Sequence, residues 1–254
     1  RLSVEVGYGG LEKAKFSFGD STTRKIPDAH VDNGPVPFGP NTLFFPPKEV
    51  LTPLKAIAFT REQKVIGFGD TYYDLITALR RPRSHHEVEP PLKQVQRELD
   101  DLFPGKIRER EDGTFEYRRG SSRYEMSQTA EGIKKIGSLV HLIRNGAVRN
   151  GTMLLFDEPS SNLHPRWILD FVELLFDLSQ VGVQIFIATH SYLVLKQFEL
   201  LAREHKQRTP LCVLSKEDDT VESRFADLSD RIPRNSIVDA SVELLNRDLY
   251  LSAK

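Results

Sequence analysis

The sequence is short of cysteine and of long apolar runs. Cys212 is the only cysteine among 254 residues, which excludes an intrachain disulfide and a cysteine-rich metal site. No apolar run approaches the roughly 18 residues that a membrane-spanning helix needs. No basic stretch followed by an apolar one opens the chain, as a secretory leader would. The sequence therefore predicts a soluble, cytoplasmic protein without a membrane span.

The chain also lacks an excess of charge of either sign. Its 35 lysines and arginines face 36 aspartates and glutamates, for a formal net charge of −1. This balance excludes a histone-like polycation and a protein organised around an acidic tail. Hydrophobic residues make up 39% of the chain, which predicts a packed core rather than disorder.

The second half of the chain alternates between helical and strand patterns. Helices are predicted over 129–145, 165–180 and 191–206, buried strands over 152–157 and 183–189, and two closing strands over 211–214 and 221–226. Continuous apolar strands that alternate with helices predict a parallel sheet covered by helices on both faces. The expected fold class is therefore α/β, with Cys212 in its core.

The first half is less regular. It predicts a strand hairpin over 2–18 that turns at Gly9–Gly10, a loop over 21–39, a short strand over 41–47, helices over 70–80 and 91–103, and an antiparallel ribbon that turns at Asp112-Gly113. We interpret the whole chain, 1–254, as one domain. Its N-terminal β part spans 1–58, a helical and β-ribbon insertion spans 59–126, and the core α/β lobe spans 127–254.

Two carboxylates, Asp157 and Glu158, end the predicted strand over 152–157. In open α/β sheets, ligands bind at the carboxyl ends of the strands. Mg²⁺ prefers oxygen ligands and bridges to substrate phosphates, and a second carboxylate can polarise a water for attack on phosphorus. The alternative is an acidic strand end that simply meets a turn.

A histidine follows the next predicted strand. His190 lies 33 residues after Asp157, the interval that one crossover helix and one strand require. We therefore expect Asp157, Glu158 and His190 to converge at one edge of the sheet. There, the histidine can bond a terminal phosphate. The alternative is a capping histidine bonded to the backbone.

The helix that begins near Gly132 offers a third polar feature. A helix N-terminus presents free N–H groups and a partial positive charge, which suit a phosphate. Gly132 allows close approach of the backbone. An ordinary helix start with a tolerated glycine is the alternative.

Taken in order, these features resemble the second half of an ABC-type ATPase head of the P-loop NTPase superfamily. The resemblance covers residues 127–191 and is closest to AAA-type ATPases grouped with the OLD, RecF and SMC proteins. It implies that Asp157 is the Walker B magnesium ligand, Glu158 the catalytic carboxylate and His190 the switch histidine. It also assigns nucleotide-binding roles to the signature residues Ser127, Thr129 and Gly132 and to the D-loop residues Ser160, Ser161, Asn162 and His164.

The sequence departs from this family pattern in two places. Ala130 stands where the signature motif has serine, so Ser127 or Thr129 is the substitute. The phosphate-binding motif G-x-x-x-x-G-K-[S/T] does not occur, because Gly34–Gly39 is followed by Pro-Asn and Gly132–Gly137 by Ser-Leu. We interpret the chain, which begins at Arg1 without methionine, as N-terminally truncated and inactive alone. A pseudo-ATPase is the alternative.

The resemblance implies an ATP-binding and ATP-hydrolysing head that uses ATP and Mg²⁺. It would act as a homodimeric nucleotide switch in DNA repair or antiphage defence, with nucleic acid or an effector protein as a further partner. An ABC transporter ATP-binding subunit and a non-catalytic interaction module are the alternatives. The arginines 118, 119 and 123 favour either phosphate binding or a mixed solvated surface, because glutamates stand among them.

Overall fold

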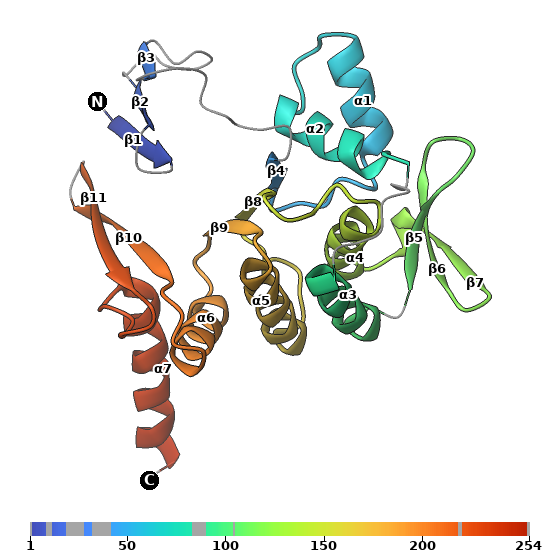
Figure 1. Cartoon of the computed structure of the whole chain (residues 1–254). Coiled ribbons are helices and arrows are strands. Elements are labelled where there is room, and N and C mark those ends of the chain that lie inside the picture. The colour runs from blue at the N-terminus through green and yellow to red at the C-terminus, as the bar shows by residue number, and fades with distance from the viewer. Residues whose placement is uncertain are drawn as a thin grey trace. The chain divides into compact units, whose positions relative to one another are not determined.

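The computed structural model describes residues 2–8, 12–18, 28–31, 42–82, 90–103, 105–217 and 220–252. The chain divides into two compact units, 1–40 and 41–254 (Figure 1). The expected boundaries at 58/59 and 126/127 stay predictions. Helix α1 (Leu54–Glu62) crosses the first of them.

The first unit is a small antiparallel sheet in the order β1-β2-β3. Its strands are β1 (Leu2–Tyr8), β2 (Glu12–Phe18) and β3 (Asp28–Val31). The predicted hairpin strands are confirmed, whereas the turn at Gly9–Gly10 lies outside the described residues. The prediction of a loop over 21–39 is wrong at β3. A four-residue strand that contains Asp28 and His30 carries too little apolar alternation to be recognised.

The second unit is built on a parallel sheet in the order β4-β8-β9. Its strands are β4 (Thr42–Phe45), β8 (Met153–Asp157) and β9 (Gln184–Ala188). Leu43 pairs with Leu154, and Leu154 pairs with Ile185. The rings of Phe45 and Phe156 stack with centroids 4.5 Å apart. The predicted α/β fold with a parallel sheet is confirmed.

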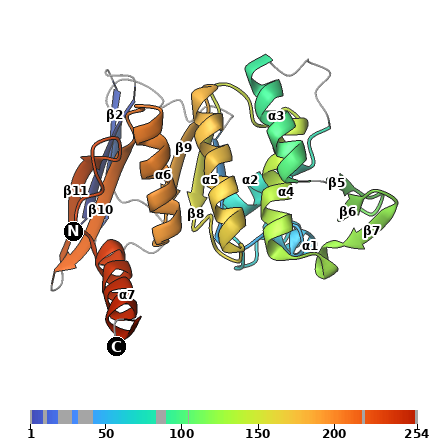
Figure 2. The same cartoon turned by 90° about the horizontal axis from the view of Figure 1, so that it is seen from below.

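Helices cover this sheet, with α2 on one side of the strands and α5 on the other (Figures 1 and 2). The helices after α1 are α2 (Asp70–Leu79), α3 (Pro90–Leu102), α4 (Glu131–Arg144), α5 (Pro165–Gln180), α6 (Tyr192–Glu204) and α7 (Ser236–Ser252), and the 3₁₀ turn η1 spans Met126–Gln128. Leu139, Leu142 and Ile143 of α4 are fully buried in the main core. Phe171 is buried and Trp167 packs against the same core, as their spacing on α5 predicts.

In the described part of the chain, no helix combines the length and apolarity needed to cross a membrane.

The predicted insertion folds as helices α2 and α3 followed by an antiparallel ribbon. The ribbon strands are β5 (Lys106–Glu109), β6 (Phe115–Arg119) and β7 (Ser122–Glu125). Ile107, Phe115 and Tyr117 turn toward the main core, so the ribbon is anchored along one face. The prediction of an antiparallel ribbon is confirmed.

The prediction that the strand over 183–189 is buried is wrong in part. β9 pairs with β8 on one side only within the described residues, and Phe186 is 48% exposed. A groove of about 320 Å³ opens beside β9, with Leu175 of α5 and Phe198 of α6 among its apolar walls. Among the described residues of the second unit, β9 is thus the last strand of the parallel sheet, and the start of β10 at Pro210 and Leu211 also lines the groove.

The closing strands do not extend the parallel sheet. β10 (Pro210–Glu217) and β11 (Thr220–Asp227) form a separate antiparallel hairpin. Cys212 is exposed, so its predicted place in the core is wrong. Side chains alternate between the two faces of a two-stranded hairpin, and a face that packs against nothing stays exposed. The apolar side chains of Leu214 and Phe225 are exposed as well.

A buried ion pair ties α4 to the turn after β4. Lys134 Nζ lies 3.0 Å from Glu49 Oε1 and 2.9 Å from Thr52 Oγ1, and both charged side chains are less than a tenth exposed. Glu49 Oε2 accepts the backbone N–H groups of Leu51 and Thr52 at 2.7 and 3.0 Å. These bonds satisfy both charges, as burial requires.

Lys134→Met should lower the free energy of unfolding by about 3–5 kcal/mol, because it strands the Glu49 carboxylate in the interior. Urea unfolding followed by circular dichroism measures the change. Lys55→Met is the matched control, since Lys55 pairs with Asp112 across an exposed surface and such pairs contribute about 0–1 kcal/mol. Equal losses in the two variants would contradict the role given to the buried pair.

An acidic cluster lies between α3 and α5. Burial, followed by the charges of Glu98 and Glu173, raises the pKa of Asp177 to about 6, against the opposing effect of His205. The folded state therefore binds more protons than the unfolded state between about pH 4 and pH 6. Stability falls as the pH rises through this window.

Asp177→Asn should raise the melting temperature at neutral pH, because it removes a carboxylate whose ionisation disfavours folding. The gain should shrink toward zero below about pH 4, where the wild-type carboxyl is protonated in both states. Calorimetric scans of both proteins across this range give the difference. A gain that is independent of pH would contradict the electrostatic explanation.

Candidate functional site

The carboxyl ends of β8 and β9 bring the predicted acidic and histidine residues together. Asp157 pairs in register with Ala188, and the backbone N–H of Glu158 donates to Ala188 O at 2.9 Å. The chain leaves both strands on the same edge, so Glu158 and His190 face each other across it. The expected meeting of Glu158 and His190 is present in the geometry, whereas no contact among the described residues joins the Asp157 side chain to either.

The Glu158 carboxylate bridges the two strand ends. Its Oε1 accepts the backbone N–H of His190 at 3.0 Å and lies 2.6 Å from His190 Nδ1. Its Oε2 lies 3.4 Å from Thr189 Oγ1, a much longer contact. Oε1 is therefore fully engaged, while Oε2 keeps room for another hydrogen-bond donor. The His190 side chain is 84% exposed, so its Nε2 faces solvent.

The backbone at Glu158 adopts an unusual conformation. Its φ is +48°, in the left-handed region that non-glycine residues rarely occupy. Such conformations cost about 1–3 kcal/mol and cluster at functional sites. Here the strained residue is the one whose carboxylate joins the strand ends.

The Asp157 carboxylate makes no hydrogen bond or ion pair with the residues that the structure describes. Within the same residues, no group of three or more His, Cys, Asp or Glu side chains forms a metal cage. Mg²⁺ does not need one, because it is usually held by one or two carboxylates, water and substrate phosphates. The donor set at this strand end therefore fits Mg²⁺ bound together with a phosphate ligand.

Lys135, which the sequence pattern did not single out, stabilises the turn after β8. Lys135 Nζ donates to Glu158 O at 3.1 Å, to Ser161 O at 3.3 Å and to Ser161 Oγ at 2.6 Å. Burial lowers the pKa of Lys135 to about 8, although Glu131, Glu158 and Asp157 act in the opposite direction. The available signal was a lysine placed among the core-facing residues of α4.

The predicted D-loop residues form a tight turn against this lysine. The Ser161 hydroxyl lies 2.8 Å from Pro47 O, which links the turns after β4 and β8. Asn162 has φ +62° and its amide bonds Glu131. His164 Nδ1 accepts the backbone N–H of Arg166 at 3.2 Å and caps α5. Ser160 contributes its carbonyl to the same turn.

The α4 start lies directly against this turn. A Cβ at Gly132 would meet Leu163 Cδ2 at 2.8 Å and Asn162 O at 3.3 Å, so glycine is needed there for packing. Ala130 caps α4 without a side-chain hydrogen bond. The first N–H groups of α4 are thus not capped by its own N-cap side chain.

The two candidate hydroxyls before α4 stay apart from the carboxylates. The Thr129 hydroxyl donates to Glu125 O at 2.8 Å, and Ser127 Oγ lies 3.4 Å from Glu125 Oε2. Neither bonds Asp157, Glu158 or His190. The structure therefore forms two groups of predicted residues, one at the strand ends and one at the α4 start.

Helices over a parallel sheet, with a carboxylate and a histidine bonded at its carboxyl edge, define an α/β protein of the class that binds ligands at that edge. Residues 60–196 match the family described as "AAA domain, putative AbiEii toxin, Type IV TA system". This match covers more than half of the chain, and the chain belongs to that family. The resemblance to AAA-type ATPase heads is confirmed, and the family supports an ATPase nucleotide-binding module.

Distant likenesses exist among solved structures. The SMC head domain from Thermotoga maritima is 14% identical with a TM-score of 0.44, over 87% of this chain and 72% of that one. The Smc head domain from Pyrococcus furiosus, bound to the C-terminal domain of ScpA, is 11% identical with a TM-score of 0.39, over 77% and 43%. A putative metal-chelate type ABC transporter is 14% identical with a TM-score of 0.32, over 80% and 76%. No curated protein matches the sequence.

Lys135→Met should loosen the turn at 158–163, because three partly buried acceptors lose their donor. We expect a loss of about 1–3 kcal/mol in the free energy of unfolding. We also expect faster hydrogen exchange at the Ser161 and Leu163 amides, which close the turn. Exchange at these amides should stay as in wild type in the Lys55→Met control. Unchanged exchange in Lys135→Met would show that the lysine does not hold the turn.

Proposed function

We propose that this chain carries the catalytic-carboxylate part of an ATPase head that hydrolyses ATP with Mg²⁺. The observation that carries the proposal is Glu158, which bridges the ends of β8 and β9 through His190 beside the unbonded carboxylate of Asp157. Membership of an AAA-domain family supports it.

Each residue at the strand ends has a distinct task. Asp157 holds Mg²⁺, which, when bound, supplies positive charge that stabilises the phosphates. Glu158 Oε2 accepts a hydrogen bond from the attacking water and orients it toward the terminal phosphate. His190, held at Nδ1 by Glu158, offers Nε2 to that phosphate. Lys135 fixes the carbonyls behind Glu158 and so fixes the direction of its side chain.

The α4 start serves the nucleotide of a second head. Its first N–H groups lack a side-chain cap and carry the positive end of the helix dipole, which suits a phosphate. Ser127, Thr129 and Gly132 lie at this end, and the turn from Ser160 to His164 packs beside it. We therefore propose a homodimer in which ATP joins two heads and hydrolysis separates them.

The P-loop is supplied by a segment outside these 254 residues. A further strand would pair with the side of β9 that faces away from β8, where no described strand of this unit pairs. A P-loop that follows such a strand would meet the same carboxyl edge as Asp157 and Glu158. The 254-residue chain alone should accordingly bind ATP weakly and turn none over.

The cellular setting we propose is DNA repair or antiphage defence, with nucleic acid or an effector protein coupled to the switch. This setting rests on the family alone, because folds and ATPase sites serve many different pathways.

Glu158→Gln in the protein that includes the P-loop should keep ATP binding and lose turnover by about 10²–10⁴-fold, the contribution of a general base. Fluorescent nucleotide titration measures the binding, and phosphate release measures the turnover. Glu204→Gln, an exposed carboxylate at the end of α6, is the matched control and should behave as wild type.

Two results would overturn the proposal. Unchanged turnover in Glu158→Gln would remove the role given to this carboxylate. Tight Mg²⁺-dependent ATP binding by the 254-residue chain alone would contradict a P-loop supplied from outside it.

A further inference from the structure

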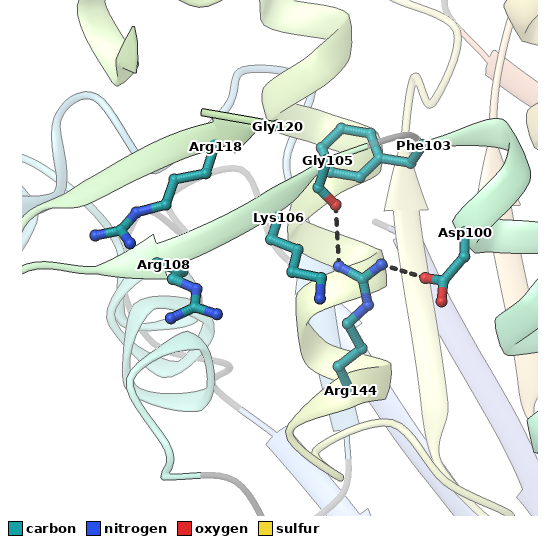
Figure 3. A pocket seen from close by; sticks show the side chains of 8 residues that line it. All are labelled: Asp100, Phe103, Gly105, Lys106, Arg108, Arg118, Gly120 and Arg144. Atoms are coloured by element: carbon teal, nitrogen blue, oxygen red, sulfur yellow. Dashed lines mark hydrogen bonds and ion pairs between the residues drawn. The ribbon is translucent and has the colours of Figure 1, made fainter. Parts of the chain in front are cut away.

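A basic pocket opens between the ribbon and the C-terminal ends of α3 and α4 (Figure 3). It encloses about 460 Å³, within the range of about 300–1,000 Å³ that ligand pockets occupy. Its lining contains four cationic side chains and one carboxylate: Lys106, Arg108, Arg118, Arg144 and Asp100. The pocket therefore carries an excess of positive charge in a chain whose net charge is −1.

The ribbon gathers like charges in a single cross-strand row. Lys106 pairs in register with Arg118, and Arg118 pairs with Arg123 on the next strand. Residues directly opposite each other project from the same face of a sheet, and like charges placed so are destabilising. This row is thus an arrangement that an anion would stabilise.

Only part of this charge is balanced within the protein. Arg144 bonds Asp100 and donates to Gly105 O at 3.1 Å, and Arg118 bonds Glu116. Lys106 and Arg108 are exposed and form no ion pair or hydrogen bond with the described residues. In Figure 3, both extend from β5 to the side of the ribbon on which the Arg144 guanidinium lies.

We propose that this pocket binds the phosphate backbone of a nucleic-acid strand. Neighbouring strands of a sheet lie about 4.8 Å apart, so a row across three strands spans about 10 Å and continues past the pocket to Arg123. That length exceeds a single phosphate group and suits a polyanion. Arginine and lysine are the side chains that neutralise such backbones.

The pocket lining offers no exposed aromatic ring for a base to stack on. Phe103 is the aromatic residue in the pocket lining, but it is 2% exposed and packs on Tyr117 with ring centroids 5.4 Å apart. It cannot stack on a base, and base stacking is what single-strand binders add to backbone contacts. The contacts that the pocket offers are therefore the charged contacts that suit phosphates.

This site is separate from the proposed ATPase site. Arg144 is the last residue of α4 and Lys135 lies near its start. Nine residues of helix separate them by about 14 Å. Binding at the pocket is therefore measurable without ATP, and its failure would leave the ATPase proposal intact.

The test uses a matched pair of charge reversals, Arg108→Glu and Arg119→Glu. Both residues are exposed arginines on neighbouring ribbon strands, but Arg119 pairs with Ser122 and projects from the opposite face to Arg118. The probe is a short fluorescein-labelled single-stranded DNA followed by fluorescence anisotropy, with circular dichroism to check folding. Lys106→Glu is a second pocket variant.

The wild-type chain should bind the DNA with an affinity that falls steeply with salt. Arg108→Glu and Lys106→Glu should each weaken binding by about tenfold and flatten the slope of log affinity against log salt by about 0.7 per lost contact. Arg119→Glu should change affinity by less than about twofold. An equal loss in Arg119→Glu would overturn the site. Pyrophosphate bound as tightly as the DNA would overturn the assignment to a strand.

Discussion

Two consecutive lysines of α4 hold together the turns at the carboxyl edge of the parallel sheet. Lys134 bonds Glu49 and Thr52 in the turn after β4, and Lys135 bonds Glu158 and Ser161 in the turn after β8. Successive residues of a helix point about 100° apart, so one short stretch of α4 reaches two different strand ends. The hydroxyl of Ser161 closes the arrangement by contacting Pro47.

This arrangement explains why the carboxylates stand where they do. Buried ammonium groups are tolerated only with full sets of partners, so each lysine dictates the path of the turn that satisfies it. The turn after β8 must then pass Glu158 through a left-handed conformation, and the Glu158 side chain meets the end of β9.

The sequence was informative where apolar periodicity was long. It predicted α4, α5, α6 and the strand β8 closely, because each has a recognisable apolar pattern. It also located β9 but overestimated its burial. It also predicted that the ends of β8 and β9 bring Glu158 and His190 together, because crossover length limits which strand ends are neighbours. The sequence did not predict β3, because four residues are too few to show a clear alternation. It did not predict the exposure of Cys212, because that depends on β10 and β11 forming a separate hairpin.

The polar links were not predictable in the same way. Lys134 and Lys135 look like an ordinary charged pair on a helix, and only the packing of α4 shows that both are enclosed. Their partners lie far away in sequence, at Glu49 and Ser161, and no local pattern joins them. The row from Lys106 to Arg123 likewise appears only once the ribbon's register is known.

Among the described residues β9 pairs with β8 alone, and this bears on how copies of the chain associate. An unpaired strand edge flanked by exposed apolar side chains is a template for adding any extended chain, including another copy of itself. A strand that pairs with this side of β9 therefore competes with the association of two copies of the chain through it.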